Sequence, residues 1–271
     1  MPVRHVSVDE LTFTVQLDGP DDGLPVLLLH GFPQGPRCFD AVLPRLHAAG
    51  LRTLAPAQRG YSEGARPAGD EPYAVEHLVD DALGLLDALG VGYAHVVGHD
   101  WGAAVAWQLA ARHPHRVSSL VVASVGHPSA LSAAMASDPD QQSRSAYMRE
   151  FAAPGAAARM LADGTDRLRE LVGVGHDLAA AVTEPAGLDA ALGWYRARGS
   201  VEFRATPAVE VPTTFVWGTE DAFLGRTQAV TTGRHVRGEY RFVELAGVGH
   251  WIPEDAAPAL AIEVVLRSSP W

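Results

Sequence analysis

Two patterns of hydrophobic residues alternate along the first half of the chain. Short apolar runs, such as residues 25–30, are typical of strands that are buried on both faces of a sheet. Between them apolar residues recur every three or four positions, most clearly over residues 73–89, which indicates helices with one buried face. The pattern predicts strands at 12–17, 25–30, 51–56, 94–98 and 117–124, and helices at 38–49, 73–89 and 101–113.

The pattern of hydrophobic residues changes in the middle of the chain. Residues 127–206 contain alanine-rich, helix-like segments and no strand pattern. Strand patterns return at 213–217 and 240–245, and a last helix is expected at about 253–267. Repeated strand–helix units form parallel sheets that are covered by helices. We therefore predict an α/β fold with a mostly parallel sheet, formed by residues 1–126 and 208–271, and an all-helical insertion at residues 127–207.

Composition restricts the possible chemistry. The chain has 271 residues, a formal net charge of −11 and neither lysine nor asparagine. The acidic excess argues against nucleic acid and anionic membrane surfaces as partners, because their phosphates would repel it. Without lysine the chain forms neither a Schiff base nor a Walker-type phosphate loop. A small molecule is therefore the expected partner.

The cysteine content and the N-terminal residues favour a soluble cytoplasmic protein. Cys38 is the single cysteine, so the sequence has no disulfide framework that would indicate secretion. Residues 1–10 lack the apolar segment of a secretory signal. No apolar run approaches the ~20 residues that span a bilayer.

The segment Gly98-His99-Asp100-Trp101-Gly102 joins a predicted strand to a predicted helix with the spacing of a nucleophile elbow. An aspartate occupies the nucleophile position. A carboxylate attacks without prior deprotonation, and at a saturated carbon it forms an alkyl ester. The alternative is that Asp100 only caps the helix that follows, which aspartate does well.

Two more segments follow in the chain order of a catalytic triad. Asp221 comes just after the strand at 213–217, with Glu220 as the competing acid, and His250 follows the strand at 240–245. A histidine there is a candidate general base, and the acid would orient its ring. The backbone amides of Phe32 and Trp101 are the candidate oxyanion hole.

This ordered set of motifs resembles the α/β-hydrolase superfamily and, within it, the soluble epoxide hydrolases. The resemblance covers nearly the whole chain and implies an α/β-hydrolase fold with a helical lid, or cap. It also implies that Asp100 is the nucleophile, Asp221 the acid and His250 the base, with no cofactor and no metal. The matching motifs are His-Gly-Phe-Pro at 30–33, Arg-Gly-Tyr at 59–61, Gly-His-Asp-Trp-Gly at 98–102, Trp-Gly-Thr-Glu-Asp at 217–221 and Gly-His-Trp at 249–251.

Two tyrosines of the insertion decide the expected reaction. By the resemblance, Tyr195, within Leu-Gly-Trp-Tyr-Arg at 192–196, and Tyr147 are the lid tyrosines that hold an epoxide oxygen. Ordinary packing of these aromatic rings is the alternative. The resemblance also leads us to expect a substrate pocket lined by His30, Trp194, Phe223 and Trp251.

The expected activity is hydrolysis of a hydrophobic epoxide to a vicinal diol, through an ester on Asp100, by a monomer or homodimer. A haloalkane dehalogenase is the first alternative, because it uses the same nucleophile and base. A departing halide needs two N–H donors, and the indoles of Trp101 and Trp194 could supply them, whereas the Phe32 side chain cannot. The second alternative is a ligand-binding protein of this fold with little turnover.

Overall fold

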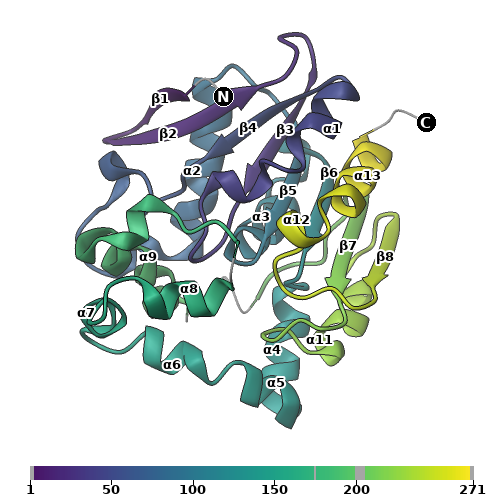
Figure 1. Ribbon diagram of the computed structural model, residues 1–271. Helices are drawn as coiled ribbons and strands as arrows, with labels where there is room; N and C mark the ends of the chain where they lie inside the picture. Colours follow the sequence, from purple (N-terminus) through teal and green to yellow (C-terminus); the bar gives the residue numbers. More distant parts are fainter. Residues whose placement is uncertain (1–2, 174, 199–204, 269–271) are drawn as a thin grey trace.

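The computed structural model describes residues 3–173, 175–198 and 205–268. In this part of the chain eight strands form one sheet in the order β1-β2-β4-β3-β5-β6-β7-β8 (Figure 1). Strand β2 is antiparallel to β1 and β4, and the other neighbours are parallel, which confirms the predicted fold class. The strands are β1 (Val3–Val8), β2 (Leu11–Asp18), β3 (Leu24–Leu29), β4 (Leu51–Pro56), β5 (Ala94–His99), β6 (Val117–Ala123), β7 (Thr213–Gly218) and β8 (Tyr240–Leu245).

Helices cover both faces of the sheet. Helices α2 (Val75–Ala88) and α3 (Trp101–Arg112) pack together on one face, and α1 (Leu43–Ala48) and α13 (Ala257–Ser268) pack together on the other. Strand β3 shows the consequence for the core. Leu27 and Leu29 belong to the first hydrophobic cluster, whereas Val26 and Leu28 belong to the second. Alternate side chains of a strand point to opposite faces, so a continuous apolar run serves both layers.

The structure differs at three places from the strands and helices predicted from the sequence. The edge strand β1 was not predicted, because Val6 is its only buried residue and its pattern is therefore weak. The helix expected at 38–49 is a short 3₁₀ turn, Pro36–Phe39, followed by α1. The last helix is likewise divided into α12 (Ile252–Asp255) and α13. Both α1 and α12 have a proline in their first turn, where the missing N–H costs nothing.

The chain between β6 and β7 contains a group of short helices, which we call the insertion helices. Figure 1 shows them, in teal and green, gathered at one end of the sheet. Of the expected insertion at 127–207, residue 174 and residues 199–204 lie outside the described part. The insertion helices are α4 (Pro128–Ser137), α5 (Pro139–Arg144), α6 (Tyr147–Phe151), α7 (Ala156–Met160), α8 (Asp166–Val172) and α9 (Pro185–Ala197).

Helix α9 contacts the loop between β4 and α2 and so connects the insertion helices to the rest of the molecule. The indole of Trp194 is fully buried and donates a hydrogen bond to the carbonyl oxygen of Arg59 over 3.0 Å. The Arg59 guanidinium in turn binds the buried Asp81 through two hydrogen bonds of 2.7 and 2.6 Å. This contact holds the loop between β4 and α2 against the insertion.

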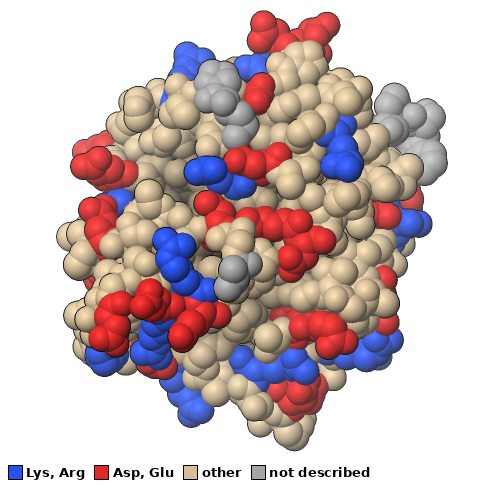
Figure 2. All heavy atoms as spheres, viewed as in Figure 1, with Lys and Arg blue, Asp and Glu red and all other residues tan. Residues whose placement is uncertain are grey.

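The charged side chains of the surface are mixed. Figure 2 shows acidic and basic residues interspersed over the face that it displays, without one extended basic area. Among the helices that the structure describes, none has the length and apolar character needed to cross a bilayer.

Candidate active site

Asp100 lies in the tight turn between β5 and α3. Its φ of 53° and ψ of −121° are strained values for a residue other than glycine. The turn is so close to the sheet that a Cβ on Gly102 would lie 2.0 Å from the carbonyl oxygen of Leu29. The Asp100 side chain makes no capping hydrogen bond to α3. Instead its Oδ1 accepts the backbone N–H of Phe32 over 2.9 Å. The capping alternative therefore does not describe this aspartate.

His250 lies between two carboxylates. Its Nδ1 donates to Oδ2 of Asp221 over 2.9 Å, and its Nε2 lies 3.4 Å from Oδ2 of Asp100. Asp221 is 1% exposed, whereas the competing acid Glu220 is exposed at the surface. The structure thus brings together the three residues that the motifs suggested as a triad.

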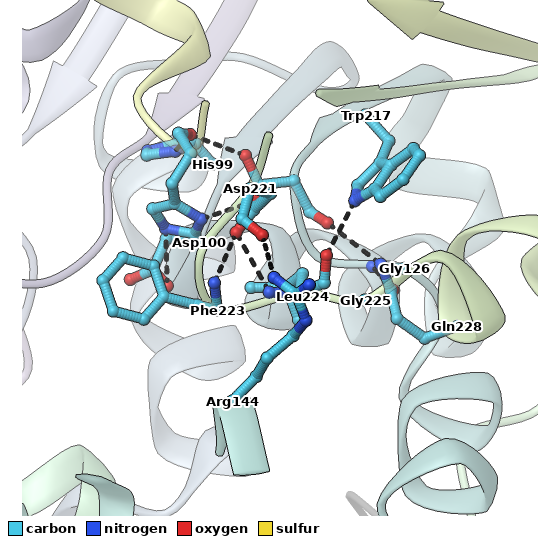
Figure 3. Close-up of polar contacts among 12 residues, drawn as sticks. His99, Asp100, Gly126, Arg144, Trp217, Asp221, Phe223, Leu224, Gly225 and Gln228 are labelled. Carbon is cyan, nitrogen blue, oxygen red and sulfur yellow. Dashed lines mark hydrogen bonds and ion pairs between the residues drawn. The ribbon is translucent and has the colours of Figure 1, made fainter. Parts of the chain in front are cut away.

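The second oxygen of Asp221 is also satisfied. Its Oδ1 accepts the backbone N–H groups of Phe223 and Leu224 over 2.8 and 3.0 Å, as Figure 3 shows. These bonds fix the carboxylate so that Oδ2 remains directed at His250.

The charges of the three residues depend on one another. Burial would lower the pKa of His250, but the neighbouring Asp221 and Asp100 outweigh it and raise the pKa to about 10. Burial would likewise raise the pKa of Asp100, but the contact with His250 holds it below its ordinary value. The resting site therefore contains an imidazolium between two carboxylates.

Residues that the sequence analysis did not single out hold the backbone of His250. Its carbonyl oxygen accepts hydrogen bonds from Nε2 of His99 over 2.9 Å and from Oγ of Ser124 over 2.8 Å. Burial lowers the pKa of His99 to about 4, so this ring is neutral and carries its proton on Nε2. The motif containing His99 was visible, but its hydrogen bond to a residue far along the chain was not.

Helix α5 holds the loop that carries the triad acid. Arg144 donates to the carbonyl oxygen of Asp221 (Figure 3). Gln141 donates to the carbonyl oxygen of Phe223 over 2.9 Å and accepts the N–H of Gly225 over 2.8 Å. The insertion is thereby connected directly to the acid of the candidate triad.

Both candidate tyrosines lie above the nucleophile. The Tyr195 ring packs edge-on against Phe32 and Trp101, with ring centroids 5.3 and 5.1 Å apart. The Tyr147 ring packs edge-on against the Tyr195 ring, with centroids 6.2 Å apart. Burial raises the pKa of both phenols, so both retain their protons at neutral pH.

Two adjoining cavities meet at Asp100. The smaller, of about 10 Å³, has room for one water molecule and is lined by Asp100 and His250 together with the two tyrosines. Phe223 and Trp251, two of the expected pocket residues, line it as well. The larger cavity has a volume of about 200 Å³ and shares Asp100, Tyr147 and Phe223 with the smaller one.

His30 and Trp194 are not among the described residues that line either cavity, contrary to expectation. His30 is fully buried; its Nδ1 donates to the carbonyl oxygen of Gly31 and its Nε2 accepts the N–H of Gln58. Burial lowers its pKa to about 4, so the ring is neutral. The Trp194 ring stacks on the His30 ring, so the two residues stabilise the loops next to the site.

The larger cavity has lining residues that the motifs did not identify. Arg198 follows α9, and Ser132 and Met135 lie on α4. Across the described ranges no group of three or more His, Cys, Asp or Glu side chains is arranged to hold a metal ion.

Comparisons with known proteins agree with this geometry. The sequence model of the alpha/beta hydrolase fold matches residues 25–257. The chain is 34% identical to AB hydrolase superfamily protein YfhM of Bacillus subtilis, covering 97% of this chain and 96% of that protein. It is 32% identical to Epoxide hydrolase A of Mycobacterium tuberculosis, with 88% of each chain covered.

Solved structures give the same result. An epoxide hydrolase from hot-environment metagenomes superimposes with a TM-score of 0.85 at 25% identity, covering 99% of both chains. Epoxide Hydrolase A from Mycobacterium thermoresistibile gives a TM-score of 0.82 at 27% identity, covering 98% of both chains. The chain therefore belongs to the α/β-hydrolase superfamily and, within it, to the epoxide hydrolase family.

Proposed function

We propose that this protein hydrolyses hydrophobic epoxides to vicinal diols through a covalent ester on Asp100. The observation that carries the proposal is the smaller cavity, where Asp100, His250, Tyr147 and Tyr195 line one space. A carboxylate nucleophile, a histidine base and two phenols are the groups that this reaction needs. The relatives named as epoxide hydrolases support the same reaction class.

In the first step Oδ2 of Asp100 attacks one carbon of the epoxide ring. Oδ1 is engaged by the Phe32 amide, so Oδ2 is the oxygen available for the new bond. The ring C–O bond breaks, and its electron pair goes to the epoxide oxygen, which takes a proton from Tyr147 or Tyr195. The result is a hydroxyalkyl ester of Asp100.

In the second step His250 removes a proton from a water molecule. The resulting hydroxide attacks Cγ of the ester. Negative charge collects on Oδ1, where the Phe32 and Trp101 amides stabilise it. The Cγ–Oδ2 bond then breaks, so Oδ2 leaves in the diol and the water oxygen replaces it. One proton of the water completes the new hydroxyl and the other remains on His250, whose earlier proton has restored the tyrosine.

Formation of the ester also changes His250 from a cation into a base. In the resting site, burial lowers the pKa of His250 but Asp221 and Asp100 raise it to about 10. The ester carries no charge, so one of the two carboxylates that hold the proton is lost. The pKa of His250 then falls, so it passes its proton to the tyrosinate left by the first step, and the neutral imidazole is able to deprotonate water.

A contact of Trp194 favours an epoxide over a haloalkane. The Trp194 indole N–H already donates to the carbonyl oxygen of Arg59. It is not available for a halide unless this hydrogen bond breaks. The Tyr147 and Tyr195 hydroxyls, by contrast, suit an oxygen leaving group.

The proposal assigns the insertion, residues 127–207, the role of a cap over a core of residues 1–126 and 208–271. Tyr147 on α6 and Tyr195 on α9 would supply the proton, whereas Asp100 and His250 come from the sheet end. The reaction would thus require both parts together.

The test is to incubate the purified protein with styrene oxide, aliphatic epoxides and bromoalkanes, and to measure diol and halide. We expect diol from the wild type and none from Asp100→Ala. Halide release without diol would instead support a dehalogenase. Saturable binding of an epoxide with no product would support a ligand-binding protein.

A further inference from the structure

The larger cavity contains a positive charge that the proposed reaction does not use. Most of its lining is apolar, as for Trp101, Leu131 and Met135. Arg198 is the one basic residue among the described lining residues, and Asp100 is the one acidic residue. Arg198 is partly exposed, so its guanidinium is at the wall of the cavity with its charge accessible to a bound molecule.

Arg198 is positioned by the same helix that carries Tyr195. It is the C-cap residue of α9, directly after Ala197 and three positions after Tyr195. Residues three apart on a helix lie on the same face, about 4.5 Å apart along its axis. The guanidinium and the Tyr195 phenol therefore belong to one face of α9, and each lines one of the two adjoining cavities.

The guanidinium of Arg198 has spare hydrogen-bonding capacity. Its Nη1 donates to the carbonyl oxygen of Met148 over 3.0 Å, which is its only hydrogen bond in the described part of the chain. Two other arginines of the insertion, Arg144 and Arg196, each pair with an aspartate. Arg198 has no carboxylate within ion-pair distance among the described residues. Its positive charge acts to lower the pKa of Tyr147, against the larger effect of burial, which raises it.

We propose that Arg198 binds a carboxylate of the substrate, so that the substrates are epoxides of carboxylic acids with an apolar chain. The inference rests on the proposed epoxide hydrolysis. A cavity with a nucleophile, apolar walls and a guanidinium complements a molecule with an epoxide, a hydrocarbon chain and an anionic group. Arginine suits this role because its planar group forms two parallel hydrogen bonds to a carboxylate. The Ser132 hydroxyl in the same cavity offers a further donor.

The test compares ω-epoxyalkanoic acids, from hexanoic to undecanoic, with the methyl ester of each. We expect the wild type to prefer the acid of the fitting length by about tenfold in kcat/KM, the size of one charge-assisted hydrogen bond. In Arg198→Gln the ratio of kcat/KM for the acid to that for the ester should fall to about one, mainly through a higher KM for the acid. Arg198→Lys should retain part of the preference.

Arg149→Gln is the matched control. Arg149 is an exposed arginine on α6 that is not among the cavity-lining residues, so its loss changes the net charge equally. It should keep the wild-type preference for the acid. As a second measurement, sodium octanoate should inhibit hydrolysis of styrene oxide competitively, and Arg198→Gln should raise its inhibition constant about tenfold.

The outcomes separate the two proposals. Equal turnover of acid and ester by the wild type, or an acid preference that survives in Arg198→Gln, overturns the role of Arg198 while Asp100-dependent diol formation stands. Absence of diol from acids, esters and simple epoxides alike overturns the proposed function and this inference with it. Thermal melting of Arg198→Gln verifies that the variant is folded.

Discussion

Replacing Gly31 by alanine should impair catalysis although no reacting group is removed. The new Cβ would lie 2.2 Å from Oδ1 and 2.4 Å from Cβ of Asp100, and ordinary contact begins at 3.4 Å. The carboxylate or the strand end must therefore move by about 1 Å, and a displacement of that size costs on the order of 10²-fold in rate. Because Oδ1 also accepts the Phe32 amide, the oxyanion contact would be disturbed by the same shift.

The assay is kcat/KM for the best epoxide found, together with the rate of ester formation in a single turnover. Gly92→Ala is the matched control, since a Cβ there would meet nothing within 4 Å. We expect a loss of about 10²-fold for Gly31→Ala, in both measurements, and none for Gly92→Ala. A folded Gly31→Ala protein with wild-type activity would refute the assignment of Asp100 and its neighbouring amide to the reacting centre.

Three further predictions follow from the same geometry. His250→Gln should accumulate the ester, seen as a protein mass increase equal to that of the epoxide; steady turnover by this variant would contradict its role as base. Tyr195→Phe keeps the ring packing but should lower the rate of ester formation by about 10²-fold; an unchanged rate would leave Tyr195 as a packing residue. Burial lowers the pKa of His127 from 6.5 to about 4, so its contribution to stability is complete above pH 6.5 and decreases as the pH falls toward 4. Thermal melting across this range should show that decrease, and His127→Gln should reduce the pH dependence; an identical slope would contradict it.

The candidate triad could be found from sequence because its signals are local. The elbow around Asp100 needs small residues at fixed spacing, and Asp221 and His250 each follow a strand whose apolar pattern is clear. Parallel strands place their carboxyl ends at one edge of the sheet, so residues far apart in the chain were expected to meet there. The sequence favoured Asp221 and left Glu220 as its competitor; in the structure Asp221 is buried and reaches His250, whereas Glu220 is exposed.

The rest of the site depends on contacts that no local pattern reveals. The motif positions of His30 and Trp194 suggested pocket residues, but their polar atoms are used by Gln58, Gly31 and Arg59. Arg198 follows Tyr195 by three positions, yet a sequence does not tell which arginine has no acidic partner among the described residues. The same limit applies to β1, an edge strand with a single buried side chain.

The most direct test of the account is the fate of water oxygen in a single turnover. Enzyme in excess over epoxide is allowed to react once in H₂¹⁸O, and the diol and the peptide containing Asp100 are weighed by mass spectrometry. Because Oδ2 of Asp100 faces the reacting space while Oδ1 is bound by Phe32, we predict that unlabelled Oδ2 enters the diol. The label should then appear in Asp100. Labelled diol with unlabelled Asp100 would mean direct attack of water on the epoxide and would contradict the ester mechanism.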